Sequence, residues 1–245
     1  MSVFRPEIIV CPRCGHRNEE TVAVSLNGPR VPAVIDAIVD GTFQCFECRA
    51  CGLPYRADGP VIYIDFDRKR WIGEIPTSME RSWALLEQQS LDSFRRALID
   101  LAPAYLRSEA DGFAIRTVFG LDALAEKIRL FDAGFDDRQV EVAKLAVLVQ
   151  IGAVIAPAWR PRVVAADSES ISLLVWRREG GADTLDPDFA GEPEAETVRV
   201  PAEEIARVAG DPAWAATLVE LSIGPYVDLG RLLLDGRVPF AAAPA

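Results

Sequence analysis

The motif CPRCG at residues 11–15 has a counterpart 37 residues further along the chain, CRACG at residues 48–52. Two residues separate the cysteines in each motif, so both sulfurs of one tight turn can face the same point. A glycine follows the second cysteine in both copies, where the turn commonly requires a positive φ. Two such turns supply four thiolates, which close the tetrahedral coordination sphere of a structural zinc ion. We therefore expect one structural Zn²⁺ with the ligands Cys11, Cys14, Cys48 and Cys51.

The second motif lies in the segment CFECRAC, which leaves an alternative choice of ligands. Cys45 also stands three residues before Cys48, but only the later pair is followed by glycine. We expect Cys45 to be a small buried strand residue beside Phe43, and a role as a ligand is the alternative. His16 is expected to form a hydrogen bond nearby rather than replace a sulfur. The other interpretations of these cysteines are a redox-active dithiol and an iron site with the same four sulfur ligands.

The residue types restrict the chemistry available elsewhere in the chain. All five cysteines lie in the first 51 residues, whereas a disulfide framework would normally staple the whole chain. The single histidine, His16, directly follows the first cysteine motif, which argues against histidine-dependent catalytic triads. One cluster of acidic residues could imitate a catalytic carboxylate site. We expect it to serve in helix capping and in interactions with the helix dipole, and a carboxylate-based enzyme is the alternative. Its members are Asp132, Asp136, Asp137 and Glu141.

The charge distribution bears on partners and location. The net charge is −11, and residues 1–76 carry 9 basic against 10 acidic residues while the remainder carries 17 against 27. An acidic chain without a basic cluster is poorly suited to neutralise phosphates, so a nucleic-acid-binding zinc ribbon is disfavoured. No apolar run reaches the roughly 18 to 20 residues that span a bilayer, and the N-terminus lacks a signal-peptide pattern. We expect a cytoplasmic protein.

The pattern around the cysteines predicts a zinc-ribbon-like antiparallel β domain. Residues 21–27 alternate with the period of a strand, and residues 31–40 form a short helical pattern that stops at Gly41. Further strands are expected within residues 42–48, 60–66 and 70–76.

From about residue 78 the period changes to that of a helix, because apolar residues recur in steps of three and four. This face contains Leu91, Phe94, Leu98, Leu101 and Tyr105, and a break is possible near residues 88–90. A strand at 113–119 and a helix that ends at Gly134 follow. Asp136 is placed to cap the next helix.

Four stretches together resemble the bacterial CpXC family, which is named for its paired Cys-Pro-x-Cys motifs. They are CPRCG, FECRACG, VIYIDFDRKRWIGEIP and TVFGLDALAEKIRLFDAGFDDRQVEVAKL. The resemblance covers about residues 1–150 and implies zinc binding without naming a reaction. The second motif departs from the family pattern, because Arg49 stands where proline is expected.

The C-terminal part reads as strands and closing helices after a linker at residues 156–163, in which Trp159 can contact a neighbouring element. An acidic loop is expected at 180–196, a loose tail at the end, and Trp176 in the core. We expect an α+β protein with a zinc-ribbon domain (1–76), a helical segment packed on it (77–156) and a C-terminal α/β-type module (157–245). The function expected is that of a non-enzymatic adaptor or accessory factor that contacts other proteins.

Overall fold

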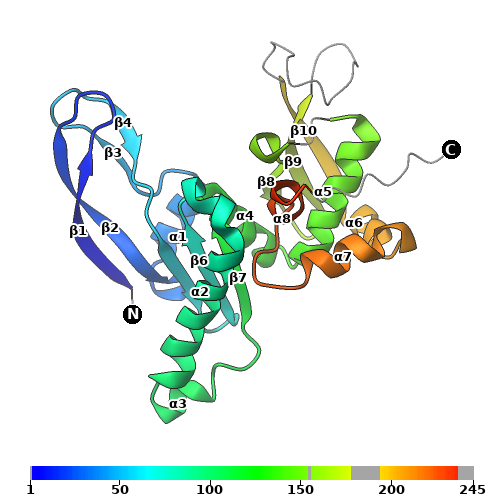
Figure 1. Cartoon of the computed structure of the whole chain (residues 1–245), viewed down its shortest axis with the longest axis horizontal. Coiled ribbons are helices and arrows are strands. Elements are labelled where there is room, and N and C mark those ends of the chain that lie inside the picture. Colours follow the sequence, from blue (N-terminus) through cyan, green and yellow to red (C-terminus); the bar gives the residue numbers. More distant parts are fainter. Residues whose placement is uncertain (1, 154–155, 178–193, 237–245) are drawn as a thin grey trace. The chain divides into compact units, whose positions relative to one another are not determined.

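The computed structural model describes residues 2–153, 156–177 and 194–236 (Figure 1). The chain forms two compact units, Met1–Ala125 (unit 1) and Glu126–Ala245 (unit 2). The predicted strand is present at 114–119 and completes the sheet of unit 1, although it lies within residues 77–156, the predicted helical segment. The α+β class is confirmed. The predicted division into three parts, at 1–76, 77–156 and 157–245, stays a prediction. Among the described residues, no helix combines the length and apolar character needed to cross a membrane.

Unit 1 is built on a five-stranded sheet with the order β1-β2-β5-β6-β7, accompanied by the separate two-stranded hairpin β3-β4. Its strands are β1 (Val3–Val10), β2 (Arg17–Asn27), β3 (Cys45–Glu47), β4 (Pro54–Arg56), β5 (Val61–Asp65), β6 (Arg70–Ile75) and β7 (Ala114–Phe119). Its helices are α1 (Pro32–Val39), α2 (Trp83–Arg95) and α3 (Ala104–Arg107), and α4 (Leu121–Asp132) begins in this unit.

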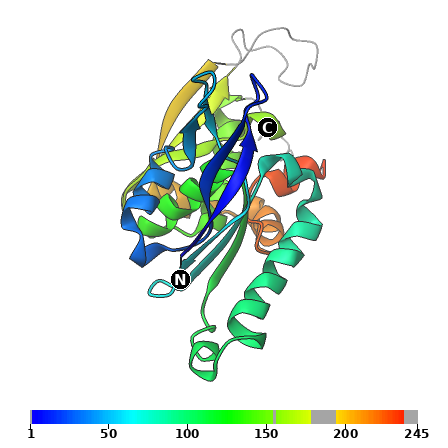
Figure 2. The ribbon, with the colours of Figure 1, turned by 90° about the vertical axis from the view of Figure 1, so that its left-hand side faces the viewer.

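The sheet of unit 1 is mixed rather than antiparallel as expected. β2 pairs with β5 in parallel over Ser25–Asn27, and β6 pairs with β7 in parallel along its length. Parallel neighbours need a long crossover connection, and the two crossovers contain α1 with β3-β4 and α2 with α3. Because β5 pairs only with the end of β2, the rest of β2 continues with β1 as a long two-stranded hairpin (Figures 1 and 2).

The helix α2 packs on one face of this sheet through aromatic contacts. The ring of Phe94 lies edge-on to Trp71 of β6 with 5.4 Å between centroids, and Leu98 is buried beside them. The helix runs unbroken through residues 88–90 and continues as a π-helical turn at Arg96–Asp100. Leu101 and Tyr105 are 76% and 71% exposed, so the expectation that they extend the apolar face is wrong. A π turn shifts the helical register, which rotates later residues away from that face.

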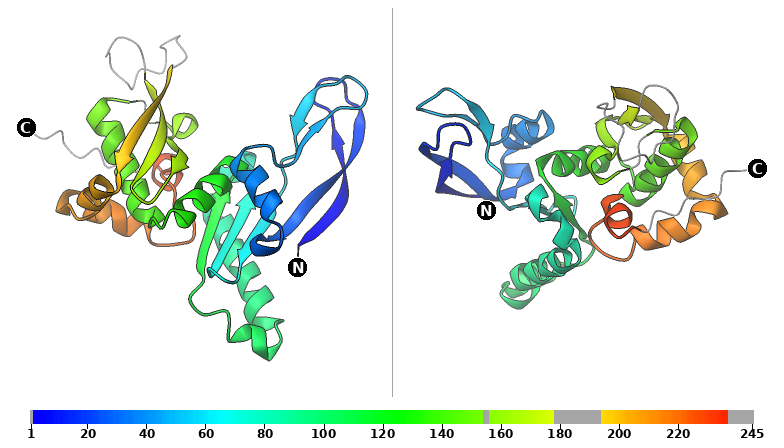
Figure 3. Two further views of the ribbon diagram at one scale, coloured as in Figure 1. Left: turned by 180° about the vertical axis from the view of Figure 1, so that it is seen from behind. Right: turned by 45° about the horizontal axis from the view of Figure 1, so that its top comes forward.

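Unit 2 contains a three-stranded antiparallel sheet with the order β10-β9-β8, and α5 packs on it (Figure 3). Its strands are β8 (Arg162–Ala166), β9 (Ser170–Arg177) and β10 (Glu194–Pro201). Its helices are α5 (Asp137–Ile151), α6 (Ala202–Ala209), α7 (Ala215–Leu221) and α8 (Gly230–Leu234). The expected second sheet and closing helices are thus present.

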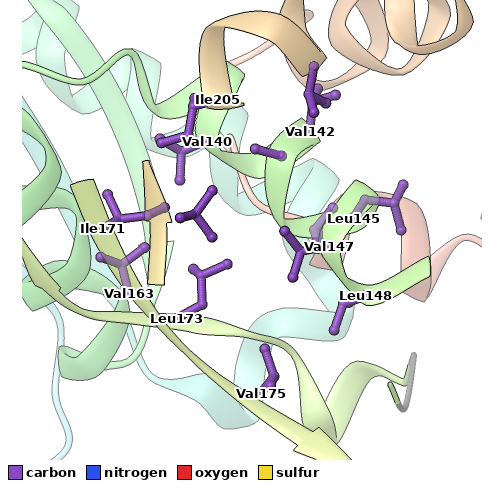
Figure 4. Packing of buried hydrophobic residues seen from close by; sticks show 14 of the residues in the cluster. Val140, Val142, Leu145, Val147, Leu148, Val163, Ile171, Leu173, Val175 and Ile205 are labelled. Carbon is purple, nitrogen blue, oxygen red and sulfur yellow. The ribbon is translucent and has the colours of Figure 1, made fainter. Parts of the chain in front are cut away.

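The core of unit 2 forms between α5 and the inward side of the sheet. Figure 4 shows Val140 and Val147 of α5 on the side of the helix that faces Ile171 and Leu173 of β9. The strand residues that enter this core alternate along β9, as expected for a sheet with one buried face.

The tryptophans of unit 2 differ in part from expectation. Trp176 is half-buried and, by the alternation of β9, lies on the face opposite the core residues Leu173 and Val175, with its ring centroid 5.9 Å from that of Trp159. The predicted contact between the linker tryptophan and a neighbouring element is therefore present, whereas full burial of Trp176 is wrong. The expected acidic loop lies mostly outside the described residues, as does the C-terminal tail.

Candidate metal centre

The four cysteines of the paired motifs come together at the tips of two β-hairpins of unit 1. Cys11 and Cys14 lie in the turn between β1 and β2, and Cys48 and Cys51 lie in the turn between β3 and β4 (Figure 1). Their Sγ atoms all lie within 4.8 Å of one another. The hairpins therefore bring together residues separated by 34 to 40 positions in the sequence.

The spacing of the sulfurs suits tetrahedral coordination. The Sγ atoms of Cys11 and Cys51 are 3.7 Å apart, as are those of Cys14 and Cys48. Four sulfurs at about 2.3 Å from a central zinc ion would be separated by about 3.8 Å along each edge of the tetrahedron. The cluster can therefore hold a metal ion.

The two turns are built in the same way. In the first, the N–H of Cys11 donates to the carbonyl of His16 (2.8 Å) and the N–H of Gly15 donates to the carbonyl of Cys11 (3.0 Å). In the second, Cys48 donates to Leu53 (2.9 Å) and Gly52 donates to Cys48 (2.8 Å). The predicted positive φ is confirmed in both copies, at +71° for Gly15 and +68° for Gly52.

A buried asparagine joins the two turns, and the sequence analysis missed it. Asn18 is 1% exposed, and its amide nitrogen donates to Sγ of Cys48 (3.7 Å) and to the carbonyl of His16 (3.3 Å). Its amide oxygen accepts from the backbone N–H of Arg49 (3.1 Å). The only local signal was a polar residue in the strand that leaves the first turn.

The surroundings of Cys48 favour its thiolate form. Burial raises the pKa of this thiol, but the backbone N–H groups of Ala50 and Cys51 and the amide of Asn18 outweigh burial and lower the pKa to about 6. Hydrogen bonds that favour the charged form have this effect because they replace the stabilisation that water would give. The thiolate is the form of cysteine that binds metals.

Cys45 and His16 lie outside the group of four sulfurs. Cys45 is exposed, so the expected burial is wrong, and its thiol donates to the carbonyls of Gly41 (3.6 Å) and Phe43 (3.8 Å). His16 is exposed as well, and it contributes its backbone carbonyl to the first turn and to Asn18.

The acidic residues at 132–141 divide between different structural roles. Asp136 caps α5 by accepting from the N–H of Arg138 (3.0 Å), which confirms the predicted cap. Asp132 is exposed, whereas Asp137 and Glu141 are fully buried. Among the described residues, only the four cysteines form a cluster of the kind that could hold a metal ion.

Asp137 and Glu141 belong to a buried charge network in unit 2 that the sequence analysis also missed. Lys127 Nζ lies 3.0 Å from Asp137 and 3.4 Å from Glu141, and Lys144 Nζ lies 2.8 Å from Glu141. Lys144 also pairs with Glu126. The remaining members of the network are Arg160, Arg162 and Asp228.

The network fixes the segment that precedes α8 to the rest of unit 2. Asp228 accepts from both Arg160 and Arg162 at 2.8 Å, and these arginines together with Lys144 and Lys127 hold its pKa well below the usual range despite burial. Glu141 accepts from the N–H of Leu229 (3.0 Å). Each carboxylate thus has a positively charged partner from the same chain.

No curated protein and no solved structure matches the chain. The family model described as CpXC protein matches residues 9–144, which is more than half of the chain and includes all four clustered cysteines. The matched region also contains residues 117–144, which are all but the last residue of the fourth stretch on which the resemblance was based. The chain therefore belongs to the CpXC family.

Proposed function

We propose that Cys11, Cys14, Cys48 and Cys51 bind one Zn²⁺ whose role is structural. The observation that carries this proposal is the closed group of four sulfurs at the tips of two hairpins. Four thiolates complete the coordination of zinc, so the site leaves no position for a substrate. The metal would join the β1-β2 hairpin to the short β3-β4 hairpin, which belongs to a separate sheet.

We propose further that the protein is a non-enzymatic adaptor or accessory factor that acts through protein–protein contacts. Unit 1 supports this with an edge strand, β1, whose side chains Phe4, Ile8 and Val10 are each about half exposed. Residues two apart share one side of a strand, so these three point the same way. Edge strands with exposed apolar side chains are suited to pairing with another chain.

The residues of the Asp132–Glu141 region give little support to the alternative of a carboxylate-based enzyme. Paired catalytic carboxylates need to face a substrate and to differ in pKa. Here Asp136 is engaged as a helix cap, while Asp137 and Glu141 are buried against lysines. The nucleic-acid alternative is opposed by the net charge of −11.

The metal proposal is tested by measuring the zinc content of the purified full chain and of single Cys→Ser variants. We expect about one equivalent of zinc in the wild type and its loss in the Cys14→Ser and Cys48→Ser variants. Cys45→Ser is the matched control and should retain the metal, because its sulfur lies outside the group of four. Loss of zinc from Cys45→Ser together with retention in Cys51→Ser would show that the ligands are assigned incorrectly.

The adaptor proposal is tested by complementation of a strain that lacks the protein. Asp132→Ala and Asp136→Ala should preserve function, because neither carboxylate is proposed to contact a substrate. Ile8→Asp should abolish function without changing the melting temperature, because it places a charge on the exposed side of β1. Complete loss of function in the Asp132 and Asp136 variants, with no more loss of stability than a missing helix cap explains, would favour the carboxylate enzyme instead.

A further inference from the structure

The two cysteine turns differ in one backbone group, although their main-chain hydrogen bonds match. Pro12 follows the first cysteine of the first turn and has no N–H to donate. Arg49 occupies the equivalent place in the second turn, and its N–H donates to Asn18 Oδ1 (3.1 Å). The departure from the Cys-Pro-x-Cys pattern therefore supplies a donor that proline would remove.

This donor determines how Asn18 is oriented. An amide oxygen can only accept and an amide nitrogen can only donate, so the N–H of Arg49 requires the oxygen on its side. The nitrogen is then turned toward its two acceptors, Cys48 Sγ (3.7 Å) and the carbonyl of His16 (3.3 Å). With 1% exposure, Asn18 has almost no access to water that could substitute for these partners.

We infer that Asn18 and the backbone N–H of Arg49 are positioning groups for the metal site, acting together on the Cys48 sulfur. This inference rests on the proposed role of the four cysteines as metal ligands. Four thiolates around a divalent cation carry a net charge of −2, and each N–H that points at a sulfur disperses part of that charge. The arrangement also ties Cys48 to the strand that leaves the first turn, which fixes the separation of the two hairpin tips.

The side chain and the backbone of Arg49 can be separated by substitution. The guanidinium donates to the carbonyl of Glu19 (2.9 Å) and lies 4.0 Å from Glu20, with the side chain 65% exposed. Arg49→Ala removes these exposed contacts and keeps the N–H. Arg49→Pro removes the N–H as well, and the matching turn at Pro12 shows that proline suits this backbone.

The experiment compares Asn18→Ala, Arg49→Pro and Arg49→Ala with the wild type in the full chain. Zinc affinity is measured by competition with a chromogenic chelator, and the ¹¹³Cd resonance of the cadmium-loaded protein reports the electronic state of the sulfurs. Asn18→Ala and Arg49→Pro should each lower zinc affinity about tenfold and shift the cadmium resonance, as expected for loss of an outer-shell partner. Arg49→Ala should match the wild type, and the Asn18→Ala/Arg49→Pro double variant should be no weaker than Asn18→Ala.

Two results overturn the inference while leaving the zinc proposal intact. One is an Arg49→Pro variant that binds zinc as tightly as Arg49→Ala. The other is an Asn18→Ala variant whose melting temperature falls while its cadmium resonance stays at the wild-type position, since that pattern indicates a general packing role. A wild-type protein that binds neither metal overturns the proposed function itself, so the two failures are distinguishable.

Discussion

The two units both bury ionisable groups, but they balance them in different ways. In unit 2, the fully buried Lys127 and Lys144 meet carboxylates of the same chain. In unit 1, the donors that face Cys48 are neutral N–H groups. Unit 1 also buries Glu74, which is 1% exposed and whose carboxyl oxygens have no hydrogen-bond partner in the described part of the chain. The buried charges of unit 2 are thus balanced by side chains of the same unit. In unit 1, we propose that the cysteine group requires a bound cation and that Glu74 requires a proton.

This difference has a physical basis in the cost of burying charge. A buried ion is tolerated only when a partner replaces the water that it loses, and otherwise the group tends to become neutral. The network of unit 2 supplies such partners from α4, α5, β8 and the segment before α8. In unit 1 the buried carboxylate of Asp65 has Arg68 as such a partner, whereas we propose that the cysteine thiolates and the Glu74 carboxyl obtain theirs from solution.

The largest effect is expected from removing one positive charge in unit 2. Lys144→Met leaves Glu126 and Glu141 facing each other without their shared partner. Breaking a buried ion pair in this way should lower the free energy of unfolding of unit 2 by about 3–5 kcal/mol. Native-state hydrogen exchange of the backbone amides of α5 measures this loss directly.

Lys69→Met is the matched control for that variant. Lys69 Nζ also forms an ion pair, at 2.6 Å from Glu109, but the two side chains are 32% and 56% exposed. Exposed pairs contribute about 0–1 kcal/mol, so this variant should remain close to the wild type. If both lysine variants lost the same amount of unfolding free energy, the proposed difference between buried and exposed ion pairs would be wrong.

A smaller effect, which depends on pH, is expected for Glu74 in unit 1. Burial, reinforced by the nearby charge of Asp58, raises the pKa of this carboxyl from 4.5 to about 8. The folded state therefore holds a proton that the unfolded state releases, and the stability that this proton contributes is lost as pH rises from about 4.5 to about 8. Relative to Glu74→Gln, the wild type should lose on the order of a few kcal/mol of unfolding free energy across that range.

Urea unfolding at a series of pH values measures this difference between the wild type and the glutamine variant. Both proteins contain the same cysteine group, so its pH dependence cancels in the comparison. Parallel stability profiles for the two proteins would mean that Glu74 is ionised in the folded state.

The smallest effect concerns the exposed end of α5. Asp136→Ala removes the side chain that accepts from the N–H of Arg138, at an expected cost of about 1 kcal/mol. Asp136→Asn keeps a good cap and loses only the ion pair with the Arg138 guanidinium, so it should cost less. Thermal melts of both variants test this order, and equal losses in the two variants would assign the stability to the ion pair.

Local features of the structure were predictable from the sequence. The cysteine turns follow from two-residue spacings with a glycine after each, and both glycines have the expected positive φ. The cap of α5 follows from an aspartate immediately before an apolar helix. These features involve residues only a few positions apart, so the chain segment itself contains the information.

Features that join distant segments were not predictable in the same way. Alternation identifies β2 and β5 as strands but does not reveal that they pair in parallel. The contact of Asn18 with Arg49 spans 31 positions, and Lys144 meets Glu126 only because α4 and α5 pack together. One signal for the network was available, since α5 is apolar around most of its circumference and a charge within such a helix must be buried.

Hydrogen exchange of the full chain, with and without a strong zinc chelator, is the most direct test of the contrast between the units. Structural metal binding is coupled to folding, so removal of zinc should abolish protection in the β1-β2 and β3-β4 hairpins. The amides of α5 in unit 2 should keep their protection, because the charge network there requires no added ion. Hairpin protection that survives the chelator, or an equal loss of protection in α5, would contradict the account.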